Sequence, residues 1–65
     1  MNPVMCEFKV YLDGEKVMED VIFAKSNEEG VLLRDIVGTS KSIAGASIIE
    51  VNVLTTRLVL EVKRT

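Results

Sequence analysis

The sequence predicts an all-β protein that folds as a small, strongly bent, five- to six-stranded antiparallel barrel of the SH3-like kind. β-branched residues, which fit the pleated surface of a sheet, are frequent: ten Val, five Ile and four Thr among 65 residues. Apolar residues recur with a period of two, and no segment sustains the spacing of an amphipathic helix. A sheet of this size must close or pair in order to hide its edges, which favours a barrel.

The first two predicted strands form a hairpin. Apolar residues alternate with polar ones over residues 6–12, which is typical of a half-buried strand. Asp13 and Gly14 then supply the strongest short turn signal in the chain. Residues 15–24 continue as a second strand, but both of its faces mix polar and apolar side chains. We therefore expect a bulge or break within it.

The rest of the chain predicts four shorter strands separated by polar or glycine-containing connections. These strands cover residues 31–35, 40–44, 48–53 and 57–62. Gly45 is placed to bend the chain between the fourth and fifth strands. In the fifth strand we expect Ile49, Val51 and Val53 to lie on the inner face.

We expect one domain over residues 1–65, with residues 1–4 as a flexible N-terminal extension. Phe8 and Phe23 are predicted to lie in the core. A chain this short buries only about 60% of its unfolded surface and often needs an additional source of stability. One cysteine cannot form an internal disulfide, so we expect a homodimer to supply that stability. It would bury a face that carries Tyr11, Met18 or Val59.

The charge balance and the short apolar runs weigh against two classes of partner, nucleic acids and membranes. Eight basic and ten acidic residues give a net charge of −2, whereas nucleic-acid-binding proteins normally carry a basic stripe. Lys9 with Tyr11 is the only basic and aromatic pair that favours an RNA-binding small barrel, which stays the alternative. The longest apolar run is four residues, so no membrane segment is expected and a cytoplasmic location follows.

Cys6 is the candidate site residue. The chain has no His, so neither a Cys-His nor a Ser-His-Asp apparatus can form within it, and no enzyme is predicted. Cys6 alternates with apolar residues and could pack as a small hydrophobic side chain. Alternatively, its thiolate could ligate Ni(II) or Cu(II), together with backbone nitrogen, an amine, carboxylates or the Cys6 of a second chain.

Three segments resemble the CooT-like family of small nickel-binding proteins, which is also described as a family of predicted RNA-binding proteins. Residues 5–12 carry the pattern M-C-x-x-K-V-Y-L, and residues 17–21 carry an apolar-M-x-D-V pattern. Residues 30–38 carry G-V-x-L-x-D-apolar-x-G. The resemblance spans residues 5–61, and its first block is the most specific.

The resemblance implies a small β-barrel homodimer that binds Ni(II) through the cysteine after the initiator methionine, which is Cys6 here. It also implies a nickel-enzyme maturation partner, because the family is linked to nickel supply for carbon monoxide dehydrogenase. One ion bridging two Cys6 residues would supply the ligands that a single chain lacks. Two departures stand out: four residues precede Met5, and the segment between Gly45 and Val51 is longer than in the family.

Overall fold

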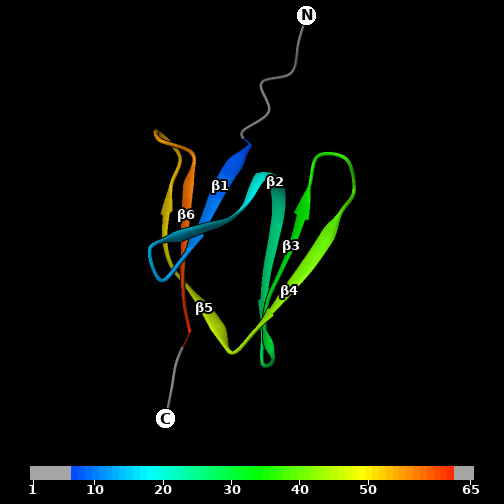
Figure 1. Cartoon of the computed structure of the whole chain (residues 1–65), viewed down its shortest axis with the longest axis vertical. Helices are drawn as coiled ribbons and strands as arrows, with labels where there is room; N and C mark the ends of the chain where they lie inside the picture. Colours follow the sequence, from blue (N-terminus) through cyan, green and yellow to red (C-terminus); the bar gives the residue numbers. More distant parts are fainter. Residues whose placement is uncertain (1–6, 63–65) are drawn as a thin grey trace, which may run out of the picture.

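The computed structural model describes residues 7–62, and within this range it contains six strands and no helix (Figure 1). The strands are β1 (Phe8–Leu12), β2 (Glu15–Asn27), β3 (Gly30–Asp35), β4 (Ser40–Ala44), β5 (Ala46–Asn52) and β6 (Arg57–Val62). The predicted all-β class is therefore confirmed, with six strands. No helix in this part of the chain is long and apolar enough to cross a membrane.

All six strands belong to one sheet in the order β4-β3-β2-β1-β6-β5. Neighbouring strands are antiparallel except β1 and β6, which run parallel, so the purely antiparallel prediction needs correction at that pair. β4 and β5 lie at the two ends of the order and diverge from Gly45, whose φ is +75°, in an open V (Figure 1). Because the sheet stays open, the expected barrel and its SH3-like closure are not confirmed.

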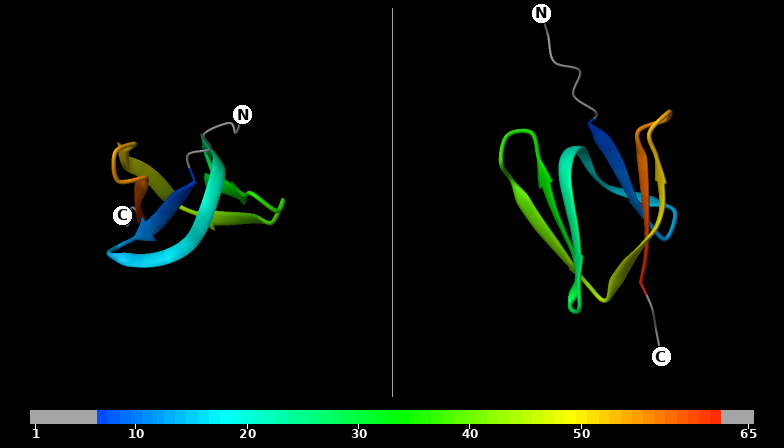
Figure 2. Two further views of the ribbon diagram at one scale, coloured as in Figure 1. Left: turned by 90° about the horizontal axis from the view of Figure 1, so that it is seen from above. Right: turned by 180° about the vertical axis from the view of Figure 1, so that it is seen from behind.

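β2 bends the sheet. Phe8 and Val10 of β1 pair with Val21 and Met18, so two steps on β1 correspond to three on β2. Asp20 lies in this bulge with a φ of +59°, and a second register shift follows between Val21 and Phe23. Bulges increase local twist and bend a strand, and β2 traces a broad arc (Figure 2). The bulge expected in residues 15–24 is confirmed.

The turn at Asp13 and Gly14 is also confirmed. Leu12 pairs with Glu15, which leaves a two-residue loop. The φ angles of Asp13 and Gly14 are +51° and +87°. Positive φ at both central positions is the geometry of a type I′ turn, whose twist matches that of the flanking strands.

The core lies on the concave side of the bent sheet. It consists of seven buried apolar side chains: Val10, Val21, Val31, Leu33, Ala46, Leu58 and Leu60. Phe8 packs against this cluster and is half-buried. The core prediction for Phe23 is wrong, since its side chain is 39% exposed. Phe23 lies just past the bulge at Ile22, and the Arg34 guanidinium stands 5.1 Å from its ring centre.

The predicted inner face of β5 is also wrong. Ile49, Val51 and Val53 are 56%, 57% and 60% exposed. A register shift between Ile48 and Glu50 leaves Ile49 as the extra residue, and this changes which side chains face the core. The inward positions of β5 are instead held by buried Ala46 and half-buried Ile48.

Candidate functional site

Cys6, the predicted site residue, lies outside the described residues. The described part of the chain leads into β1, which begins at Phe8 and pairs there with Val21 of β2. Residues 1–4, predicted as an extension, also lie outside the described part.

An apolar groove opens beside the start of β1. It has a volume of about 250 Å³ and lies between the start of β1, the second half of β2 and the hairpin of β5 and β6. All eight lining residues are apolar: Phe8, Val21, Ile22, Phe23, Ala24, Ile48, Val51 and Leu58. The register shift at Ile22 in β2 and the one at Ile49 in β5 both contribute to the groove. Beside them, Ile22, Phe23 and Val51 are exposed and not packed in the core. We name this surface the β1–β2–β5 groove.

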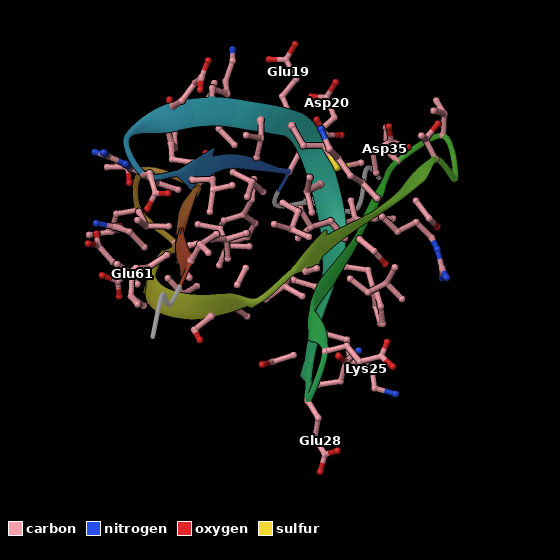
Figure 3. All side chains as sticks on the ribbon, turned by 60° about the horizontal axis from the view of Figure 1, so that its bottom comes forward. Glu19, Asp20, Lys25, Glu28, Asp35 and Glu61 are labelled. Carbon is pink, nitrogen blue, oxygen red and sulfur yellow. The ribbon has the colours of Figure 1, made fainter. Side chains whose placement is uncertain are left out.

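Among the carboxylates on the described surface, that of Asp35 has a role in local structure. Asp20 and Asp35 lie near each other, whereas Glu28 and Glu61 lie well apart from them (Figure 3). Asp35 Oδ1 accepts hydrogen bonds from the backbone N–H of Val37 at 3.1 Å and of Thr39 at 2.8 Å, which stabilises the turn between β3 and β4. Over residues 7–62, no three His, Cys, Asp or Glu side chains gather closely enough to hold a metal ion.

The basic and aromatic pair behind the RNA-binding alternative lies on the outer face of β1. Lys9 aligns with Arg57 on β6, and Tyr11 aligns with Val59. The Arg57 guanidinium stands 4.8 Å from the centre of the Tyr11 ring, a cation–π arrangement that covers one face of that ring. Base stacking needs an accessible aromatic face, so the half-buried Tyr11 offers only a reduced platform.

The fold and the groove define a small β protein with one open six-stranded sheet and an apolar groove on its described surface. The profile of the CooT family, described as CO dehydrogenase accessory protein CooT, matches residues 5–61. The chain therefore belongs to the CooT family, as the resemblance predicted. The matched range begins at Met5 and includes Cys6.

A solved structure supports the same assignment. The crystal structure of a candidate CooT protein from Carboxydothermus hydrogenoformans is 30% identical in sequence and superposes with a TM-score of 0.80. The match covers 91% of this chain and 100% of that one. A search of curated proteins found no match. The family description is that of an accessory protein and not of a catalyst, in agreement with the prediction that the chain is not an enzyme.

Sequence reasoning missed the groove. Its lining comes from four strands that are distant in sequence, and no local pattern joins Phe8, Val21 and Val51. One signal was available: Ile22 and Phe23 are neighbouring large apolar residues in a strand. Because successive side chains point to opposite faces of a sheet, one of the two must leave the core face.

Proposed function

We propose that this protein binds Ni(II) and carries it to a carbon monoxide dehydrogenase during maturation of that enzyme in the cytoplasm. The proposed ligand is the Cys6 thiolate, with one ion shared by the two Cys6 residues of a homodimer. The observation that carries the proposal is membership of the CooT family over residues 5–61, a range that contains the Met5-Cys6 motif. Carbon monoxide dehydrogenase requires nickel, and an accessory protein with a thiolate is suited to supply it.

The composition restricts the ligand set. A chain with one Cys and no His cannot form a four-coordinate site of thiolates and imidazoles by itself. Ni(II) accepts square-planar sites of nitrogen and sulfur donors. Two Cys6 thiolates and two nitrogens from the N-terminal segments would complete such a site. The free amine is one source of nitrogen if the native chain starts at Met5, whereas a start at Met1 places the amine four residues further away.

The test is a Ni(II) titration of wild type and Cys6→Ser, followed by ultraviolet absorption. Thiolate coordination produces ligand-to-metal charge-transfer bands, so wild type should develop them and Cys6→Ser should not. Glu28→Gln is a matched control, because Glu28 is an exposed carboxylate at the loop between β2 and β3 (Figure 3). This control should bind nickel as wild type does.

The affinity should fall as pH is lowered, because the proton competes with the metal for the thiolate. Cys6→Ser should show no such thiolate-linked change. Nickel binding of equal strength in wild type and Cys6→Ser would contradict the proposal. A chain starting at Met5, compared with one starting at Met1, would then show whether the amine contributes, since only an amine ligand makes the shorter chain bind more tightly.

A further inference from the structure

We propose that the outer face of β1 and β6 binds a carboxylate on the surface of a partner protein, with Lys9 and Arg57 as the cationic contacts. Lys9 and Arg57 are in-register neighbours on these two strands, and both side chains are exposed. Asn52 of β5 pairs with Arg57 on the other side of β6. We name these three residues the Lys9–Arg57–Asn52 row. The proposal goes beyond nickel binding and rests on residues 7–62 alone.

The row places two like charges side by side. Neighbouring strands lie about 4.8 Å apart, and like charges directly opposite each other in a sheet repel and destabilise it. Among the described residues, the only salt bridge joins Lys16 to Glu19 at 3.2 Å. No carboxylate of residues 7–62 therefore neutralises Lys9 or Arg57 in a salt bridge. A carboxylate supplied by another molecule would relieve this repulsion.

The side chains of the row are arranged to donate hydrogen bonds. The Arg57 guanidinium stands 4.8 Å from the centre of the Tyr11 ring, and stacking on an aromatic face restrains its planar fork. Asn52 Oδ1 accepts a hydrogen bond from the backbone N–H of Thr55 at 3.1 Å, which leaves the side-chain NH2 group of Asn52 as a donor. An ammonium, a guanidinium and an amide NH2 group thus follow one another across β1, β6 and β5. An oxyanion is the chemical class that such donors recognise.

The surroundings of the row favour a protein carboxylate over the backbone of a nucleic acid. Strand β2 carries Glu19 and Asp20 in the bulge on the β1 side of the row, and β5 carries exposed Glu50 at the other end. A nucleic acid binds by having several neighbouring phosphates neutralised, and these three carboxylates would repel the phosphates on both sides. A protein surface can place basic side chains on either side of one carboxylate, and it then complements the row and its flanks together.

A second copy of the chain is the competing occupant, because the sequence predicted a dimer face at Tyr11, Met18 or Val59. Met18 packs against the core, the Tyr11 ring is covered by Arg57, and Val59 is half-buried. Little apolar surface is therefore left on this face, whereas homodimer interfaces are the more apolar class. The occupant proposed here is accordingly a different protein, recognised through charge.

The test is a nuclear magnetic resonance titration of the full chain at low ionic strength, because salt screens exposed charges. The probe is the acetylated and amidated peptide Lys-Ala-Glu-Ala-Lys, and the control peptide has Gln in place of Glu. The backbone amide shifts of Lys9, Arg57 and Asn52 should change and saturate with the Glu peptide only. Lys9→Gln and Arg57→Gln should each weaken binding about two- to fivefold, the effect of one exposed ion pair.

Lys25→Gln is the matched control variant. It removes the same charge from an exposed position on the part of β2 that pairs with β3 (Figure 3), and it should leave the affinity for the peptide unchanged. Lys9→Gln should also keep or raise the free energy of unfolding, because it removes a like-charged neighbour of Arg57. Circular dichroism checks that the variants fold, and Lys9→Gln alone tests the row if Arg57→Gln does not.

Several results would overturn the proposal. They are an absence of saturable shifts in the row, equal shifts with the Gln peptide, unchanged binding by the row variants, and a lower free energy of unfolding in Lys9→Gln. Tighter binding of a short oligouridine RNA than of the Glu peptide would overturn it in favour of a nucleic acid. A change in the oligomeric state of the row variants, measured by sedimentation, would overturn it in favour of a second copy.

Discussion

Strands β3 and β5 have similar apolar content but bury it very differently. Val31 and Leu33 of β3 are 1% and 0% exposed, whereas Ile49 and Val51 of β5 are more than half exposed. β3 lies between two neighbours, β2 and β4, while β5 ends the sheet and has only β6 beside it. The residues of β3 thus stabilise the single chain. Ile49 and Val51 of β5 contribute little to it, because their side chains stay largely in contact with solvent.

The largest expected effect comes from the fully buried position on β3. Leu33→Ala should lower the free energy of unfolding by about 2–5 kcal/mol, because it leaves a cavity in the core. Leu54→Ala, at a residue that is 97% exposed in the turn after β5, should change it by less than about 0.5 kcal/mol. Urea unfolding at equal protein concentration measures both. Similar losses at the two positions would contradict the contrast between packed and open regions.

A smaller effect is expected where β3 and β4 approach each other closely. Gly30 has a φ of +150°, and a Cβ atom there would collide with the backbone carbonyl of Ile43. Gly30→Ala should therefore destabilise the protein by about 1–3 kcal/mol. Gly14→Ala is the control, since its φ is +87° but no atom lies within 4 Å of the added Cβ. Thermal unfolding should show the greater loss at Gly30, and the reverse order would refute this account of the β3–β4 contact.

The smallest effect is expected on β5 itself. Ile49→Thr keeps a β-branched side chain at an exposed bulge position and should change monomer stability by less than about 0.5 kcal/mol. Ile43→Thr on β4 places a hydroxyl at a half-buried site packed against the core, and should cost about 1–3 kcal/mol. Denaturant midpoints at low protein concentration compare the two. A larger loss at Ile49 than at Ile43 would show that Ile49 is part of the monomer core.

The sequence predicted the features that depend on local pattern. Alternation placed strands at residues 40–44 and 57–62, and β4 and β6 cover the same residues. The Asp13-Gly14 turn was predictable because its geometry requires positive φ at both positions. The mixed faces of residues 15–24 correctly indicated a bulge, because no regular strand could bury them consistently.

Features that depend on distant partners were not predictable. The parallel pairing of β1 with β6 brings together the first and the last described strands, and no local sequence signal specifies it. The bulge at Ile49 reversed the expected faces of β5, since a one-residue slip moves each side chain to the other face. Cys6 stays a prediction from the Met5-Cys6 block and its family resemblance. The apolar groove could be recognised only from the three-dimensional arrangement of four strands.

The central claim is that one Ni(II) ion is shared by the Cys6 thiolates of two chains. Native mass spectrometry of wild type with increasing nickel tests it most directly, because it reports chain number and metal content together. The account predicts a species with two chains and one nickel ion, which Cys6→Ser does not form. Nickel bound one per single chain, or bound equally by Cys6→Ser, would contradict it.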